Sequence, residues 1–197
     1  MGKGRLEAFS DGVIAILITI MVLDLKLPAD ETFAAFVRIL PTLCAYLLSF
    51  VLVGIYWNNH HHMLQVTDQV NGAILWSNLH LLFWLSLIPF GTRWISETHA
   101  AAVPMAAYGV DLIFCGAAYT VLQLAIIRLT GPDSTLARAV QRDIKGKLSL
   151  VIYAAGIGLA FVNPLISAAC YAGVAIMWLV PDPRIEKAVS PPESRAQ

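Results

Sequence analysis

The residues best suited to chemistry lie at the start of the chain, beside an apolar run. At or just inside the start of this run lie a guanidinium, a hydroxyl and two carboxylates, from Arg5, Ser10, Glu7 and Asp11. Ionised side chains are costly inside a membrane span unless they have partners or face water, so they mark functional positions. We expect these groups to form hydrogen bonds or ion pairs with other helices.

A run of three histidines, His60 to His62, is the second candidate. Imidazoles bind transition metals and titrate near neutral pH. Successive helical residues point about 100° apart, so three adjacent histidines cannot ligate one ion together. Asp68 is the one carboxylate spaced to help, and the three cysteines lie singly in apolar runs. The pattern therefore predicts no metal site and no bound cofactor.

Isolated polar residues lie in two later apolar runs: His80 in one, Asp111 and Gln123 in the other. Such residues more often form hydrogen bonds between helices than line a pathway. No GxSxG, HExxH or P-loop pattern is present, so the sequence does not predict an enzyme. Two alternatives stay open: a proton-coupled secondary transporter that uses Asp11, Asp111 and the histidines, and a membrane-embedded metal or redox protein.

The composition identifies the elements that must position these groups. Apolar residues make up 58% of the 197 positions and charged residues 13%, against about 25% charged in soluble domains. A spanning helix needs about 20 residues. The sequence therefore predicts an all-α integral membrane protein with six spans, at 9–27, 33–57, 72–95, 104–129, 148–162 and 164–180. Pro89 should kink or end the third span. A net charge of zero gives no reason to expect a nucleic-acid partner.

The distribution of cations predicts the orientation. With six spans and an inner N-terminus, only Lys26, Arg38 and Arg93 of the thirteen Lys and Arg residues fall outside. Inner loops are enriched in Lys and Arg, so both termini are expected in the cytoplasm. The loop 58–71 is assigned to the same side although it contains no Lys or Arg. Residues 1–180 form the membrane domain, and 181–197 are expected to be a disordered cytoplasmic tail.

The first span has one continuous apolar stripe. At 100° per residue, the positions on it are Arg5, Phe9, Gly12, Ile16, Ile20, Leu23 and Leu27. Asp11 points nearly opposite. The stripe alone is compatible with packing against lipid, against another helix or along a pore.

Two segments resemble a known family. The stretch from Arg5 to Gly12 resembles the RxxxFSD motif that opens the first helix in the transmembrane protein 175 family, cation channels that conduct potassium without a TVGYG filter. Trp57 to His61 resembles the family's Trp-x-x-His-His segment at the end of the second helix. The single six-span repeat expected for this chain resembles the layout of the family's bacterial members. The resemblance implies a homotetramer in the lipid bilayer of the bacterial inner membrane.

The resemblance also implies that the first helix lines the pore. The family's constriction lies five positions after the motif's Asp, which corresponds to Ile16 here. Ile20 and Leu23 lie on the same stripe and extend the constriction, with the hydroxyl of Thr19 beside it. An apolar ring sets a diameter and the wetting of the pore but cannot coordinate an ion. We expect a potassium channel with a hydrophobic gate and weak selectivity over sodium and other monovalent cations.

The motif residues are expected to hold the inner end of the first helix by a polar network. Its members are Arg5, Phe9, Ser10, Asp11, Trp57, His60 and His61. At the outer end, fourfold repetition of Asp24 would create a negative potential that concentrates cations. Asp30 and Glu31, farther along the loop, are expected to be solvated.

Overall fold

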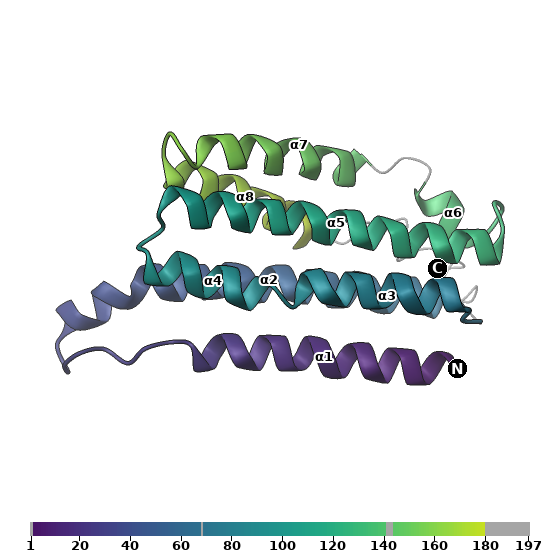
Figure 1. Cartoon of the computed structure of the whole chain (residues 1–197), viewed down its shortest axis with the longest axis horizontal. Coiled ribbons are helices and arrows are strands. Elements are labelled where there is room, and N and C mark those ends of the chain that lie inside the picture. The colour runs from purple at the N-terminus through teal and green to yellow at the C-terminus, as the bar shows by residue number, and fades with distance from the viewer. Residues whose placement is uncertain (1, 68, 141–143, 180–197) are drawn as a thin grey trace, which may run out of the picture.

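The computed structural model describes residues 2–67, 69–140 and 144–179, and every regular element in these ranges is a helix. The elements are α1 (Lys3–Leu23), α2 (Phe33–Gln65), α3 (Gly72–Leu85), α4 (Ile88–Glu97), α5 (Ala102–Thr130), α6 (Thr135–Val140), α7 (Ile144–Leu159) and α8 (Pro164–Leu179) (Figure 1). The expected tail, 181–197, and Asp68 lie outside the described residues.

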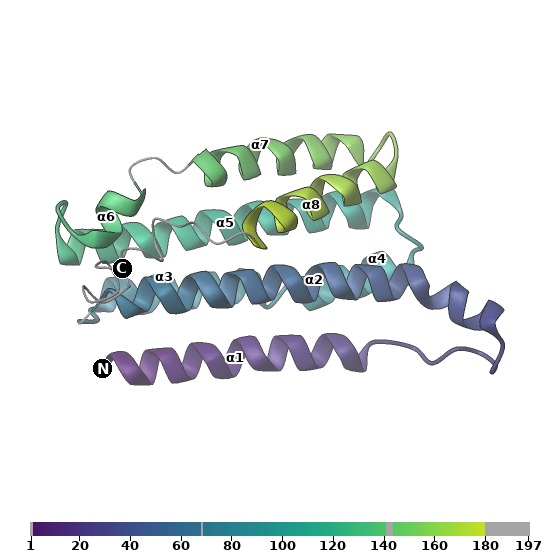
Figure 2. The ribbon, with the colours of Figure 1, turned by 180° about the vertical axis from the view of Figure 1, so that it is seen from behind.

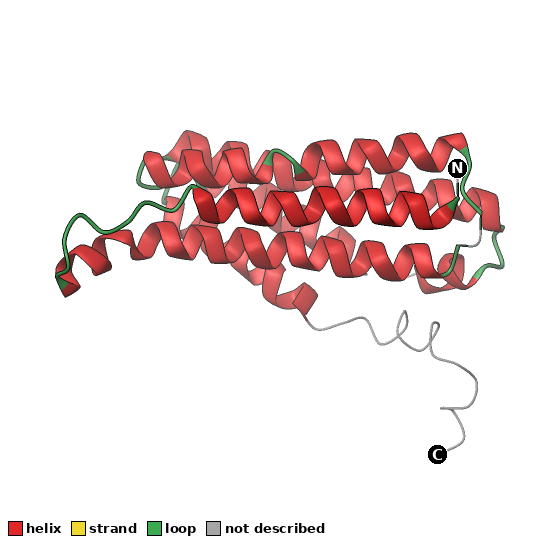
Figure 3. Cartoon of the chain, turned by 90° about the horizontal axis from the view of Figure 1, so that it is seen from below, coloured by secondary structure: helices red, strands yellow, loops and turns green. Residues whose placement is uncertain are grey.

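The long helices run side by side in one elongated bundle (Figures 1 and 2). Helix α1 packs against α2, α3 and α4, while α5 joins α3 and α4 to the hairpin of α7 and α8. The loop after α1 and the start of α2 extend beyond the rest of the bundle (Figure 3). Helix α1 therefore lies at the edge of the subunit with one side uncovered.

Four segments are long and apolar enough to cross a membrane: 3–23, 33–65, 72–97 and 102–130. The expected division at Asn163 and Pro164 is confirmed, because α7 ends at Leu159 and α8 begins at Pro164. Each of these two helices has 16 residues, fewer than the roughly 20 that a span needs. The count of six crossings therefore stays a prediction.

Helix α2 differs from the expectation at its C-terminal end. The loop predicted at 58–71 is wrong, because α2 continues to Gln65 and includes all three histidines. Polar side chains do not end a helix when they find partners, and Asn59 donates from Nδ2 to the carbonyl oxygen of Ile55 at 2.8 Å. Consequently the Trp57–His61 segment presents its side chains at helical spacing.

The third predicted span is two helices in line. Helix α3 ends at Leu85, and α4 begins at Ile88 with Pro89 in its first turn. Proline lacks an N–H and clashes with the preceding turn, so the predicted interruption is confirmed. At the far end of α4, His99 and Ala100 adopt positive φ values of 51° and 59°, a conformation costly for residues with a Cβ.

Two glycines allow the α7–α8 hairpin to approach α5. A Cβ at Gly109 would lie 2.1 Å from the hydroxyl oxygen of Tyr171, and one at Gly156 would lie 2.6 Å from Cε1 of the same tyrosine. Tyr171 is fully buried and donates to the carbonyl oxygen of Met105. The absence of side chains at these two positions makes room for the tyrosine that joins α8 to α5.

Candidate functional site

Helix α1 has a buried face and an exposed face. The buried positions are Leu6, Ser10, Ile14, Leu17 and Met21. The predicted stripe is on the other side, with exposed fractions of 57% for Ile16, 43% for Ile20 and 82% for Leu23. Phe9 is 48% exposed. The apolar stripe is therefore not used in packing within the subunit.

The Thr19 hydroxyl lies on this exposed side and donates to the carbonyl oxygen of Ile16 at 2.9 Å. Because the hydroxyl hydrogen is used in this bond, the lone pairs of the Thr19 oxygen remain available to accept a hydrogen bond or to coordinate a cation. A cation is coordinated through such lone pairs. The exposed face thus offers apolar side chains together with one oxygen ligand.

A chain of buried hydrogen bonds holds the opposite face of α1. Ser10 donates to the carbonyl oxygen of Leu6 at 2.9 Å and accepts from Nδ2 of Asn78 at 2.9 Å. The Oδ1 atom of Asn78 lies 2.7 Å from Nε2 of His60, so with this amide orientation the histidine donates through Nε2. Ser10, Asn78 and His60 are at most 1% exposed. This chain joins α1, α3 and α2.

A second contact holds α1 to α2 nearer the surface. The Trp57 indole donates from Nε1 to Oδ1 of Asp11 at 2.9 Å. The His61 ring stacks on the indole with ring centroids 6.1 Å apart and accepts a hydrogen bond from the Gln65 amide. The carboxylate of Asp11 is thus directed by a tryptophan whose own position is set by His61.

The structure brings together only part of the predicted network. Ser10 meets His60 through Asn78, and Asp11 meets Trp57, but Arg5 and Phe9 lie exposed outside both contacts. Asn78 was missed in the sequence. It is an amide in an apolar run, a pattern that often marks a hydrogen bond between helices. His80, which drew attention in the same run, is exposed and accepts from the indole of Trp84 one turn away.

The interhelical hydrogen bonds expected for Asp111 are not found. Its side chain is 9% exposed, and neither carboxylate oxygen has a hydrogen-bond partner among the described residues. Among those residues there is also no group of three His, Cys, Asp or Glu side chains able to hold a metal ion. The histidine run is divided instead, since His60 contacts Asn78 and His61 contacts Trp57 and Gln65.

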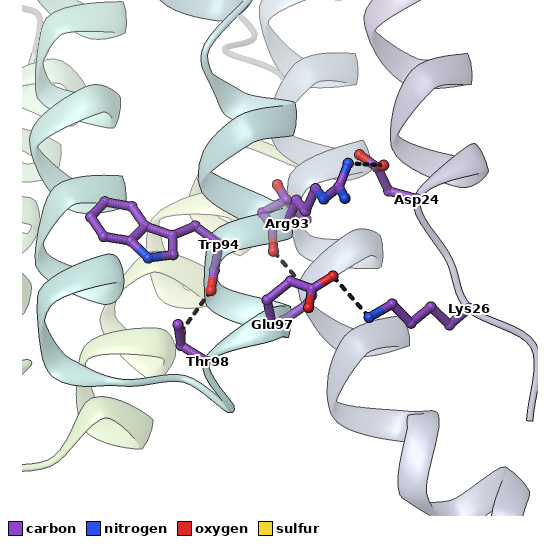
Figure 4. A network of polar contacts seen from close by, with 8 residues as sticks. Asp24, Lys26, Arg93, Trp94, Glu97 and Thr98 are labelled. Carbon is purple, nitrogen blue, oxygen red and sulfur yellow. Dashed lines mark hydrogen bonds and ion pairs between the residues drawn. The ribbon is translucent and has the colours of Figure 1, made fainter. Parts of the chain in front are cut away.

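The far end of α1 is held by charged groups (Figure 4). Asp24 is the C-cap residue of α1, where the helix dipole disfavours a carboxylate, and Arg93 of α4 binds it with Nη1 and Oδ1 3.2 Å apart. Two residues on, Lys26 binds Glu97 with Nζ and Oε1 2.9 Å apart. The negative potential expected from Asp24 is therefore partly offset by Arg93.

The loop after α1 carries two further carboxylates, and one of them has a structural task. Asp30 accepts hydrogen bonds from the side-chain hydroxyl and the backbone N–H of Thr32, and these bonds lower the pKa of its carboxyl. Thr32 in turn caps α2 by accepting from the N–H of Ala35. Asp30 is exposed, as expected, and through Thr32 it also helps to start α2.

The chain is similar to proteins of known type. The family described as endosomal/lysosomal potassium channel TMEM175 matches residues 5–89, which include all of α1 except its first two residues, the whole of α2 and α3, and both motifs. A potassium channel of Chryseobacterium sp. (strain P1-3) is 53% identical over 189 residues, covering 96% of this chain and 98% of that protein. A potassium channel of Streptomyces collinus is 32% identical and covers 89% and 91% of the two chains.

The fold is likewise similar to a solved structure. The crystal structure of a lysosomal potassium-selective channel TMEM175 homolog from Chamaesiphon minutus aligns with a TM-score of 0.76 at 25% identity. The alignment covers 90% of this chain and 96% of that one. The likeness therefore extends over nearly the whole chain and is not confined to the two motifs.

Proposed function

The chain belongs to the transmembrane protein 175 family of potassium channels, and from this premise we propose that it conducts potassium through a pore lined by α1 of four subunits. The observation that carries the proposal is the division of α1 into two faces. One face is fixed to α2 and α3 by buried hydrogen bonds, while the other exposes an apolar stripe. Four such stripes around an axis would enclose a narrow apolar passage.

The gate in this proposal is a set of apolar rings formed by Ile16, Ile20 and Leu23. Branched aliphatic side chains offer no oxygen to a dehydrated ion, so they control permeation by diameter and by wetting. A weak preference for potassium over sodium follows, because the proposed gate has no ring of carbonyl oxygens to replace the hydration shell of the ion. The Thr19 oxygens, beside the stripe, would be the nearest ligands that replace part of the hydration shell.

The buried polar chain would set the angle of α1 toward the axis. Hydrogen bonds among Ser10, Asn78 and His60 fix both the rotation and the height of the helix, because each partner comes from a different helix. Asp11 and Trp57 add a contact on the same end. These residues would act on the open population and not on ion preference, since the buried side chains of Ser10, Asn78 and His60 face away from the exposed stripe.

The assembly and orientation are part of the same proposal. We place a homotetramer in the bacterial inner membrane with both termini in the cytoplasm, because all Lys and Arg residues except Lys26, Arg38 and Arg93 then fall on the inner side. The exposed guanidinium of Arg5 lies at that end, on the uncovered side of α1. The permeant ion is potassium, and the proposal needs no cofactor.

A second candidate, a proton-coupled secondary transporter, is favoured by one observation only. The carboxylate of Asp111 is buried without a hydrogen-bond partner among the described residues, as in many proton-binding groups of carriers. The transporter requires a proton gradient or a co-substrate for net potassium movement. The channel passes potassium down its own gradient and gives discrete single-channel steps in a planar bilayer.

The test of the channel is Ile16→Asn, which places amides in the proposed gate. We expect faster potassium flux from liposomes, because polar groups keep the constriction wet. Val22→Asn is the matched control: it adds the same group to an exposed position of α1, about 120° round the helix from Ile16. Equal flux in the two variants would contradict the proposed gate.

A further inference from the structure

A cavity of about 270 Å³ lies at the end of the bundle that holds the α1–α2 loop. We call it the loop-end cavity. Its walls come from the end of α1 and the following residues, one face of α2, one face of α4, and His99 in the turn after α4. The cavity is not fully enclosed, so a ligand can enter it from outside the subunit.

The carboxylates in the wall are already paired. Asp24 binds Arg93 and Glu97 binds Lys26, and Figure 4 shows both pairs bridging from the end of α1 to α4. Arg38 is the remaining cation of the lining, and it has no ion pair or hydrogen bond among the described residues. The cavity thus carries one uncompensated guanidinium.

Two further donors lie on the same face of α2 as Arg38. Thr42 and Tyr46 follow at intervals of four residues, so the three side chains form a row along the helix, and all three line the cavity. Neither hydroxyl makes a hydrogen bond to another described residue, and the half-buried Tyr46 ring packs against Phe50 and the apolar core. We call Arg38, Thr42 and Tyr46 the donor row.

The rest of the wall is partly apolar, with Met21, Leu25, Ile39 and Pro89 beside the charged groups. A site that combines a free guanidinium, hydroxyl donors and aliphatic surface matches an anion attached to a less polar body. A phosphate is well suited to this site, because two of its oxygens can accept parallel hydrogen bonds from the planar guanidinium of Arg38.

We propose that the loop-end cavity binds a phosphate group through Arg38, with Thr42 and Tyr46 donating to oxygens of the same ligand. The source is either inorganic phosphate or the headgroup of a phospholipid. A lipid would contact more of the site than free phosphate. With its phosphate on Arg38, its ester oxygens would lie farther along α2, beside the hydroxyl groups of Thr42 and Tyr46. The proposal does not depend on how ions permeate.

The experiment uses the full-length protein and two probes. Dioleoylphosphatidylglycerol retained after transfer from nanodiscs to detergent is counted by native mass spectrometry. Inorganic phosphate is tested by thermal unfolding in detergent, against chloride at equal ionic strength. Retained lipid identifies a headgroup site, and a higher unfolding temperature with phosphate alone identifies a free-anion site. Neither effect in the wild-type protein would overturn the proposal.

Arg38→Gln removes the charge and should weaken either form of binding about tenfold. Arg128→Gln, which changes an exposed arginine at the opposite end of the bundle, should leave binding unchanged. Tyr46→Phe removes one donor with little change in volume and should weaken binding about fivefold. Equal binding by the Arg38 and Arg128 variants would overturn the assignment, and so would full binding by Tyr46→Phe.

Discussion

The two ends of α1 are attached to the subunit by different physical means. At the N-terminal end, neutral side chains of Ser10, Asn78 and His60 form hydrogen bonds while at most 1% exposed. At the far end the contacts are ion pairs, and the cations are well exposed, 60% for Arg93 and 74% for Lys26. One attachment is shielded from water, whereas the other is in contact with it.

This difference predicts which end of α1 can move. Buried hydrogen bonds are costly to break because the separated groups stay away from water. Exposed ion pairs contribute little and are weakened by salt. If α1 lines the pore as proposed, its N-terminal end is a fixed pivot and the end near Leu23 is the adjustable part of the gate.

Removing the centre of the buried chain should have the largest effect. Asn78→Leu leaves Ser10 and His60 buried without their shared partner, so we expect the free energy of unfolding to fall by about 2 kcal/mol. Reversible denaturant unfolding in mixed micelles measures this loss. The loss should be the same at low and high salt, because no ion pair is involved.

Asn58→Leu is the matched control for that change. Asn58 is exposed near the end of α2, so the same substitution there should shift the free energy of unfolding by less than about 0.5 kcal/mol. If the two variants are equally stable, the hydrogen bonds through Asn78 do not hold α1, and the N-terminal end of α1 is not a fixed pivot.

The sequence was informative about α1 because its signals are local. The family resemblance drawn from the stretch Arg5–Gly12 and from Trp57–His61 is confirmed by the comparisons. The interruption at Pro89 and the division at Asn163 were also predictable, since proline acts on the adjacent turn. Each of these features depends on residues close together in the chain.

Features that depend on the register between helices were not predictable. The end of α2 was placed at Trp57 because polarity was taken as a boundary, while His60 is in fact the most buried of the histidines. Asn78 and Arg93 have partners 68 and 69 positions away, at Ser10 and Asp24. Only the packing of α3 and α4 against α1 selects such partners.

A double-mutant cycle on Asp24 and Arg93 tests the adjustable end, and its effect should be smaller. With Asp24→Asn and Arg93→Gln we expect a coupling energy of about 0.5 kcal/mol at low salt. It should approach zero near 1 M salt, where the screening length is about 3 Å. Denaturant unfolding at the two salt concentrations gives both values. A coupling that resists salt would mean that this pair is shielded like the buried chain.

The smallest effect is expected from the same cycle on Lys26 and Glu97. Lys26 is more exposed than Arg93, at 74% against 60%, and Glu97 is more exposed than Asp24, at 44% against 28%. A lysine also loses more rotamer freedom for each hydrogen bond than an arginine does, so the coupling should be weaker than for Asp24 with Arg93.

The two pairs also differ in the segment that they attach to α4. Asp24 caps α1 itself, while Lys26 lies in the loop beyond it. Potassium flux should therefore change more in Asp24→Asn than in Lys26→Gln. The reverse order would show that α4 controls the gate through the loop and not through the last turn of α1.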